Sequence, residues 1–291
     1  MLEVGNSNER GRFYARSFLY TPALDVATLK KARDTDADVC LLDLEDSVPL
    51  ARKDEARRLC VEVLKTWPST RPTAVRINEM RSAEFARDVT AFVDAGVAPD
   101  IVVMTMVDSA VEVEVLKTLL RRERLCPQVY CTIETPAAIR NLEDIAGESA
   151  GLILGSADLA ATLVVDIDWD NMLYARQRLV MAAAGCGAAA VDTACFNFEH
   201  SGQVQEEARR CKALGFHGKV AVHPSQVAPI NEVFGVADDA LDWAQRVVQA
   251  CENAGGGVVR LADRMVGPPF VKKARVLLGR AAAPGGRACR R

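Results

Sequence analysis

Several scarcities limit what this 291-residue chain can do. It has only three histidines and no CxxC pair, so a zinc site is not expected. Its formal net charge is −3 and its basic residues are spread along the chain, which gives nucleic-acid binding no electrostatic support. It has no membrane-length apolar run, and no apolar signal core opens the sequence. We therefore expect a cytoplasmic protein that binds neither nucleic acid nor membrane.

The chain is rich in apolar residues, which make up 49% of it and can bury a large core. Nine cysteines are present, but Cys40, Cys131 and Cys195 lie in or beside apolar, strand-like runs. A reduced thiol packs there as a small hydrophobic group. We therefore do not expect a disulfide framework.

Short apolar runs alternate with amphipathic helical stretches, which include residues 83–95 and 137–146. The eight predicted strands are residues 18–21, 39–43, 73–77, 101–105, 129–134, 151–155, 188–192 and 219–222. Nearly continuous apolar strands with helical crossovers indicate a parallel sheet covered on both faces, and eight such units favour an α/β fold of the (β/α)8 TIM-barrel type. An open doubly wound sheet is the alternative, but no GxGxxG loop supports it.

The expected organisation has four parts. They are an N-terminal extension (1–15), a TIM barrel (16–236), a C-terminal helical extension that we expect to pack on a neighbouring subunit (237–280), and a disordered tail (281–291).

Polar residues recur where the predicted strands end, which is the active-site end of a TIM barrel. Glu134 and Asp158 follow two consecutive strands. Two carboxylates without a neighbouring basic residue can hold a hard divalent cation such as Mg²⁺, whose other ligands would be water or substrate oxygens. The alternative is that both acids only complement helix N-termini.

Arg76 ends the third predicted strand, where its guanidinium could grip a carboxylate or stabilise an enolate oxygen. Asp43, Glu45 and Asp46 follow the second strand. Glu45 or Asp46 could orient Arg76 or a metal-bound water. The alternatives are a structural ion pair of Arg76 with Asp43 or Glu45, and an acidic cap on the helix that begins near Lys53.

Six motifs together resemble the citrate lyase β-subunit-like group of the HpcH/HpaI aldolase superfamily, which includes malyl-CoA and citramalyl-CoA lyases. They are residues 16–22 (RSFLYTP), 41–48 (LLDLEDSV), 75–78 (VRIN), 133–136 (IETP), 155–160 (GSADLA) and 218–226 (GKVAVHPSQ). The resemblance runs in order from about residue 16 to residue 278. It implies a TIM barrel, Mg²⁺, carbon–carbon lyase chemistry on a hydroxyacyl thioester, and homo-oligomers, with a trimer favoured.

The resemblance also implies roles for individual residues. Glu134 and Asp158 match the family's metal ligands, and Arg76 matches a substrate-binding arginine. Tyr20 and Lys31 match positions that contact coenzyme A in some relatives. The turn formed by Val222, His223 and Pro224 matches one near the thioester-binding face, where we expect a backbone contact to the ligand.

Three departures from the family pattern qualify this reading. A basic residue that often follows Pro22 is absent, which makes a carrier-protein thioester or a free acid more plausible. Met106 replaces a lysine, and Gly267 replaces an aspartate that handles a proton in several lyases. A positioned proton donor contributes about 10²–10⁴-fold to a rate. The loss of the aspartate at position 267 therefore matters more than the loss of the lysine at position 106.

The leading hypothesis is a Mg²⁺-dependent lyase that cleaves a β-hydroxy acyl thioester, or a related hydroxy acid, into a 2-oxo acid and an enolate-derived fragment. One alternative keeps the fold but runs condensation or thioester hydrolysis on a specialised metabolite. The other is a non-catalytic, metabolite-binding subunit. The acyl group and its carrier, coenzyme A or acyl carrier protein, are not fixed by the sequence.

Overall fold

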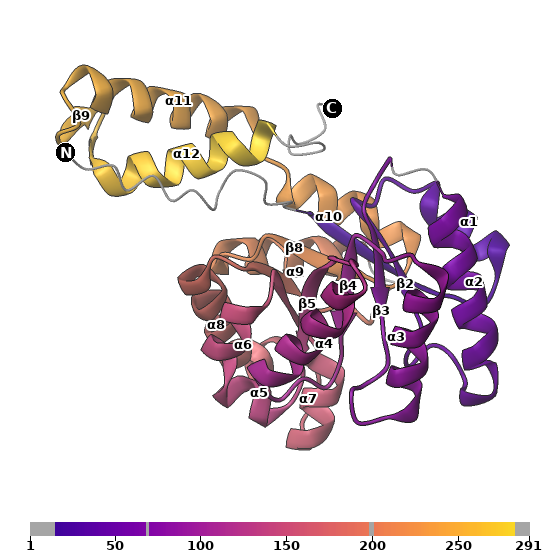
Figure 1. The fold of residues 1–291 in the computed structure, drawn as a ribbon. Helices are drawn as coiled ribbons and strands as arrows, with labels where there is room; N and C mark the ends of the chain where they lie inside the picture. The colour runs from indigo at the N-terminus through magenta and orange to yellow at the C-terminus, as the bar shows by residue number, and fades with distance from the viewer. Residues whose placement is uncertain (1–14, 68–69, 198–200, 283–291) are drawn as a thin grey trace.

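A computed structural model describes residues 15–67, 70–197 and 201–282 (Figure 1). Eight parallel strands close into a barrel in chain order, since β1 pairs with both β2 and β8. The strands are β1 (Ser17–Pro22), β2 (Val39–Asp43), β3 (Thr73–Arg76), β4 (Ile101–Met104), β5 (Gln128–Ile133), β6 (Gly151–Leu154), β7 (Ala189–Asp192) and β8 (Gly218–Ala221). The predicted TIM barrel is confirmed, and the open sheet is excluded.

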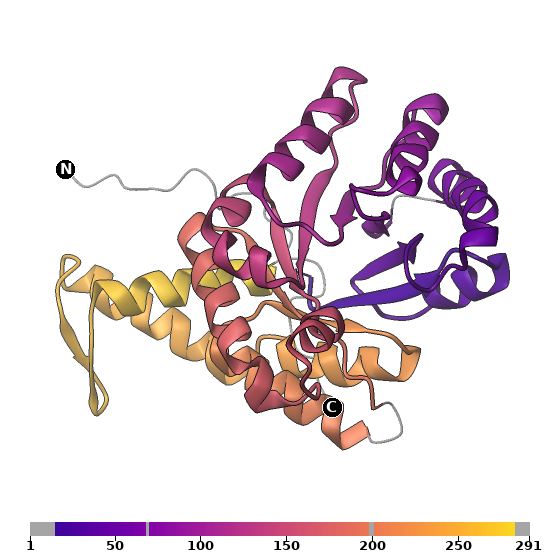
Figure 2. The same cartoon turned by 90° about the horizontal axis from the view of Figure 1, so that it is seen from below.

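Helices surround the barrel (Figure 2). They are α1 (Val26–Arg33), α2 (Lys53–Thr66), α3 (Ala83–Ala95), α4 (Ala110–Arg122), α5 (Pro136–Arg140), α6 (Leu142–Glu148), α7 (Ser156–Leu163), α8 (Trp169–Cys186), α9 (Ser201–Leu214) and α10 (Val227–Phe234). Two short 3-10 turns, η1 (Leu50–Arg52) and η2 (Pro224–Gln226), precede α2 and α10. α7 was not predicted, although it carries Asp158.

The barrel interior is filled by side chains rather than open. Phe18 and Tyr130 pack against each other with ring centroids 5.8 Å apart, and both are at most 1% exposed. Gly151 makes room for them, because a Cβ there would lie 2.1 Å from the Tyr130 ring. Tyr20 packs on the edge of this interior cluster. A ligand site must therefore lie at one end of the strands, beyond these packed side chains.

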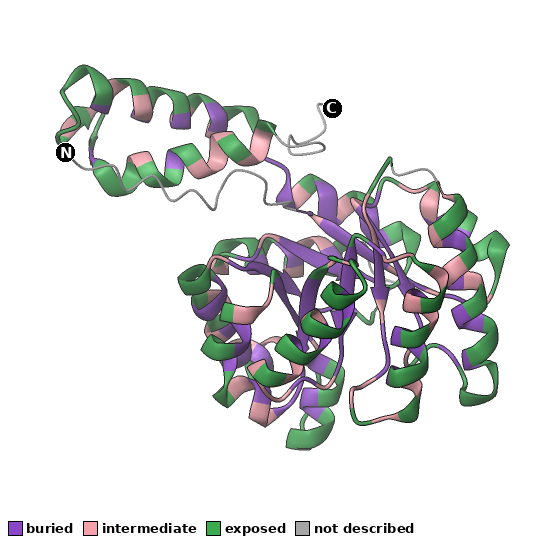
Figure 3. Ribbon diagram, viewed as in Figure 1, coloured by how far each residue is buried: buried purple, intermediate pink, exposed green. Residues whose placement is uncertain are grey.

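The C-terminal residues form an arm that projects from the barrel in both ribbon views (Figures 1 and 2). Its elements are α11 (Asp238–Asn253), the antiparallel pair β9 (Val259–Leu261) and β10 (Arg264–Val266), and α12 (Pro268–Ala282). Its core is small and holds five buried residues, Ala244, Val247, Cys251, Val266 and Ala274. Most of the arm is exposed or half-buried (Figure 3).

Some predictions concern parts of the chain without a structural description. The N-terminal extension up to residue 14 and the tail from residue 283 lie outside the described residues. Among the helices that the structure describes, none combines the length and apolar character needed to cross a membrane.

Candidate active site

A cavity of 360 Å³ lies at the carboxyl ends of the barrel strands. It is lined by residues that lie in or shortly after β1, β2, β3, β5, β6, β7 and β8, so the closed barrel brings together positions far apart in the sequence. Six of the predicted site residues line it: Tyr20, Asp46, Arg76, Glu134, Asp158 and Val222.

Glu134 is a buried acid at the base of this cavity. It is 4% exposed, and its Oε1 accepts a hydrogen bond of 2.6 Å from the backbone N–H of Met106. Met106 adopts a left-handed conformation (φ 51°), which is uncommon for a residue other than glycine. Burial, reinforced by Glu45 and Asp158, raises the pKa of Glu134 to about 8. Within the described ranges no Lys or Arg forms an ion pair with it.

Gly155 brings the start of α7 against Glu134. A Cβ at this position would lie 2.4 Å from Glu134 Oε2 and 2.8 Å from Thr132 Cγ2. This close approach places exposed Asp158, in the first turn of α7, on the same cavity as Glu134. Glycine is needed here because a larger residue would not fit. Its backbone conformation is not the reason, since a φ of −98° is open to any residue.

The two carboxylates suit a hard divalent cation. No group of three or more His, Cys, Asp or Glu side chains that could hold a metal occurs in the described part of the chain. Glu134 and Asp158 would thus leave the remaining positions around Mg²⁺ to water or substrate oxygens, as this ion prefers. Thr132 adds a buried Oγ1 with no hydrogen-bond partner at the same cavity. A cation with its oxygen ligands would satisfy all three groups.

Arg76 is held rigidly by acids. Its Nε and Nη2 donate to the two oxygens of Asp43 at 2.7 and 2.6 Å, and its Nη1 lies 2.8 Å from Glu45. Such a two-pronged pair fixes the plane of the guanidinium. The ion pairs proposed as an alternative are therefore present, but Arg76 also lines the cavity. Its remaining N–H groups are available to a ligand.

Asp43 stands behind Arg76 rather than on the cavity. It is 1% exposed and also accepts hydrogen bonds from the backbone N–H of Glu45 and from Ser47. Burial alone would raise the pKa of Asp43, but the bonds from Arg76 hold it below its ordinary value. Neither Asp43 nor Glu45 is among the cavity-lining residues, so both act here through Arg76. Asp46 is largely exposed at the rim.

Tyr20 forms the opposite side of the arginine. The guanidinium carbon of Arg76 lies 5.0 Å from the centroid of the Tyr20 ring. Burial raises the pKa of Tyr20 well above its usual range, although Arg76 opposes this shift. The phenol therefore stays protonated and offers the cavity a neutral hydroxyl.

Two residues suggested by the family resemblance lie off the cavity. Lys31 is exposed on α1 and does not line it. His223 is exposed and caps η2, where its Nδ1 accepts from Ser225 N at 3.2 Å. Val222 does line the cavity, and its backbone N–H donates to Gln226 Oε1 at 2.9 Å. That N–H is therefore already used within the protein.

The structure adds residues that the sequence did not single out. Thr132, Ser156, Thr193 and Phe196 line the cavity, and the Ser156 and Thr193 hydroxyls lie 2.8 Å apart. Asp192 ends β7. It is fully buried and pairs with Lys219 at 2.8 Å and with Arg176 at 2.9 Å. Ser156 lies in the motif at residues 155–160 but carried no role there, and no local motif marks the others, because their contacts join distant segments.

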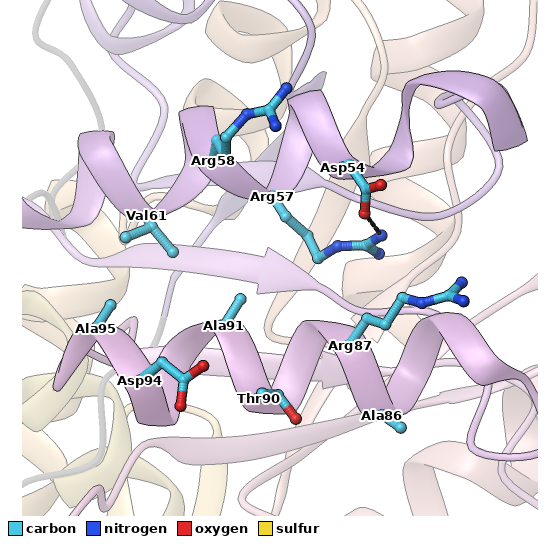
Figure 4. Close-up of a pocket in the computed structure, with 10 residues that line it drawn as sticks. All are labelled: Asp54, Arg57, Arg58, Val61, Ala86, Arg87, Thr90, Ala91, Asp94 and Ala95. Atoms are coloured by element: carbon cyan, nitrogen blue, oxygen red, sulfur yellow. Dashed lines mark hydrogen bonds and ion pairs between the residues drawn. The ribbon is translucent and has the colours of Figure 1, made fainter.

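A groove of 690 Å³ lies elsewhere, between α2 and α3 on the outside of the barrel (Figure 4). Its buried arginine, Arg57, already pairs with Asp54, Glu84 and Asp88. The groove is larger than the strand-end cavity but lacks Glu134, Asp158 and Arg76. We therefore place the active site at the strand ends.

Comparisons with known proteins identify the family of this chain. Residues 16–224 match the HpcH/HpaI aldolase/citrate lyase family, and residues 169–285 match a C–C bond lyase of the TIM-barrel fold. The citrate lyase subunit beta of Escherichia coli K12 is 33% identical over 287 residues, which cover 93% of this chain and 94% of that protein. The (3S)-malyl-CoA thioesterase of Cereibacter sphaeroides is 30% identical and covers 92% and 95% respectively.

A solved structure extends the likeness to the arm. The CitE protein of Mycobacterium tuberculosis, in complex with magnesium, acetoacetate and coenzyme A, superposes with a TM-score of 0.78 at 30% identity. The match covers 94% of this chain and all of that one. The motif series, the closed barrel and these relatives together show that the chain belongs to the HpcH/HpaI aldolase/citrate lyase family.

Proposed function

We propose that this protein is a Mg²⁺-dependent carbon–carbon lyase that cleaves a β-hydroxy acyl thioester, or a related hydroxy acid, into a 2-oxo acid and an enolate-derived fragment. The observation that carries the proposal is the buried carboxylate of Glu134, which shares one cavity with Asp158 and Arg76. Relatives named as citrate lyase and citramalyl-CoA lyase, and a CitE structure with magnesium and acetoacetate, support this chemistry.

The residues of the cavity divide the work. Glu134 and Asp158 would hold the metal, which when bound supplies Lewis acidity toward the hydroxyl and carboxylate oxygens of the substrate. The free N–H groups of Arg76 would bind a substrate carboxylate or stabilise the oxygen of the departing enolate. Asp43 and Glu45 fix the arginine in advance, so little reorganisation is needed during the reaction.

A second candidate function is thioester hydrolysis at the same site. Gly267 stands where several lyases of this family carry a proton-handling aspartate, and one relative is named as a malyl-CoA thioesterase. Gly267 lies at the start of α12, where its carbonyl accepts from Phe270 N at 2.9 Å. Gly267 has no side chain that could carry a proton, which leaves proton transfer to another group.

We also propose that the chain forms a homo-oligomer, with a trimer favoured by the family resemblance, and the exposed surface of the arm supports association. Met265 and Phe270 on the arm are 62% and 42% exposed, and the five-residue core leaves much of both helices uncovered (Figure 3). A neighbouring subunit would cover this surface. The proposed partners are therefore a small 2-oxo or hydroxy acid, or its coenzyme A or carrier-protein thioester, and further copies of the chain.

The experiment incubates the protein with malyl-CoA, citramalyl-CoA and citryl thioesters, with Mg²⁺ or EDTA, and measures 2-oxo acid and free thiol separately. Lyase activity requires Mg²⁺ and releases a 2-oxo acid but no free thiol, whereas hydrolysis releases free thiol but no 2-oxo acid. Glu134→Gln should abolish the metal-dependent release, while Glu62→Gln on the exposed face of α2 should not. Full turnover by Glu134→Gln would contradict the proposed metal site.

A further inference from the structure

A second cavity, of 390 Å³, adjoins the active site. It lies between the segment that enters α8, the end of β7, and α9. Thr193, Ala194 and Phe196 line both cavities, so the two meet at this wall. The two cavities are therefore adjacent, and a ligand that spans both has to pass these side chains.

Arg176 lines the second cavity and is incompletely satisfied. It is 3% exposed, and its Nε donates to Asp192 at 2.9 Å. Its Nη1 is buried and makes no hydrogen bond. Buried donors in folded proteins are normally paired, so this unpaired nitrogen, on a side chain that lines the cavity, calls for an acceptor that a ligand could supply.

Arg210 brings a second guanidinium to the same cavity from α9. It is exposed, and in the described ranges no carboxylate lies within ion-pair distance of it. Both arginines stack on Trp169, with their guanidinium carbons 4.4 Å (Arg176) and 3.9 Å (Arg210) from the ring centroid. The indole therefore holds two cationic groups at one wall without neutralising either.

The acidic residues of this cavity are already engaged. Asp168 caps α8 by accepting from Asn171 N at 2.8 Å. Glu206 pairs with Arg209 at 3.3 Å. Glu207 pairs with the buried Lys219 at 3.2 Å.

Arg210 differs from the other cations around this cavity in its pairing. Asp192 pairs with both Arg176 and Lys219, and Glu207 also pairs with Lys219. Among the described residues no carboxylate lies within ion-pair distance of Arg210, so an anionic group of a ligand could pair with its guanidinium.

We propose that this cavity binds a carboxylate at the far end of the substrate's acyl group, held by Arg176 and Arg210. The inference rests on the proposed function, since it assumes that the 2-oxo or hydroxy acid end of the same molecule lies at Glu134 and Asp158. The site thus selects acyl groups that carry a second acid several bonds from the reacting carbons. Paired guanidinium groups are well suited to carboxylate recognition.

The test compares binding of pyruvate, 2-oxoglutarate and 2-oxoadipate to the full chain with Mg²⁺, by calorimetry and by Trp fluorescence. We expect at least one of the two diacids to bind about tenfold tighter than pyruvate, as a bond to a charged group allows. Arg210→Gln should remove this preference and leave pyruvate binding unchanged. Arg122→Gln, on the exposed face of α4 and outside the cavity lining, is the matched control and should keep it.

A second variant and three outcomes keep the test decisive. Arg176→Lys preserves a cation beside Asp192 and should also remove the preference. Equal affinities for all three acids, or a preference that survives Arg210→Gln, would overturn the inference. If pyruvate does not bind but a diacid binds in an Arg210-dependent way, the anion site stands and the proposed lyase function fails.

Discussion

The sharpest prediction concerns Gly155, where one added methyl group should damage the metal site while leaving the fold intact. In Gly155→Ala the new Cβ would lie 2.4 Å from Glu134 Oε2 and 2.6 Å from Glu134 Cβ. Both separations fall about 1 Å short of ordinary contact, so Glu134 or α7 must move by a comparable distance. The backbone is no obstacle, because the φ of −98° is open to alanine.

The expected magnitudes follow from this displacement. Disturbing a group that positions metal ligands typically costs about 10–100-fold in metal affinity. Overpacking in a tight site costs about 1–3 kcal/mol of stability. Gly147→Ala is the matched control, because Gly147 lies within α6 and a Cβ there meets nothing within 4 Å. That control should gain about 0.5–1 kcal/mol, since it restores helix propensity.

Calorimetric titration with Mg²⁺ and urea unfolding would be run on both variants and on the unmodified chain. The reasoning requires a cooperatively folded Gly155→Ala protein with weakened Mg²⁺ binding, beside a Gly147→Ala protein with normal binding. Equal Mg²⁺ affinity in all three would refute it, because Glu134 would then not be a ligand or its position would not matter.

Three further predictions follow. Asp43→Asn should reduce turnover by about 10²-fold with Mg²⁺ affinity unchanged, because Arg76 loses the carboxylate that fixes its orientation. Steady-state kinetics would measure turnover and calorimetry the Mg²⁺ affinity, and normal turnover would contradict the prediction. Thr132→Val should raise the free energy of unfolding by about 1 kcal/mol in the absence of ligands, because it removes a buried unpaired hydroxyl, and it should weaken 2-oxo acid binding. Urea unfolding measures the first effect and a pyruvate titration the second. A lower free energy of unfolding would count against this prediction. Burial alone would raise the pKa of Asp192, but Lys219 and Arg176 hold it below its ordinary value. The stabilising effect of the Asp192 carboxylate is therefore present above about pH 4 and is lost as the pH falls through its folded-state pKa. Urea unfolding midpoints across this pH range should decline less in Asp192→Asn than in the unmodified chain, and parallel declines would disprove the link.

The sequence predicted the barrel well because its strands are defined locally. The predicted range 39–43 coincides with β2 (Val39–Asp43), and the range 83–95 coincides with α3 (Ala83–Ala95). Such runs carry their own apolar pattern, and Ser82 caps α3 by accepting from Phe85 N. The predicted helix over 137–146 was wrong in one respect: it is interrupted at Asn141, which ends α5 and precedes α6.

Elements with weak local patterns were missed. β9 and β10 have three residues each and turn at Ala262, whose φ of 55° no composition rule would signal. α7 is short, and its many alanines give it no clear apolar face.

Site residues at strand ends could be predicted from the sequence. Site residues defined by contacts between distant segments could not. Glu134, Asp158 and Arg76 could be placed at one end of the barrel by strand register alone, and the structure puts all three on one cavity. Lys31 was assigned by resemblance, but it lies on α1 away from the cavity. Conversely, Arg176 stands mid-helix in the sequence, and only the contact of α8 with β7 reveals its unpaired nitrogen.

The bond from Met106 to Glu134 has a consequence for how freely this sequence can change. The donor is a main-chain N–H, so the Met106 side chain has no part in fixing the carboxylate. Position 106 should accept many substitutions, limited mainly by its left-handed backbone, which β-branched residues adopt poorly. In a saturation library selected for Mg²⁺ binding, many residue types would be recovered at position 106, whereas position 155 would remain glycine. The most tolerant and the most restricted positions of the site would thus lie on either side of the same carboxylate.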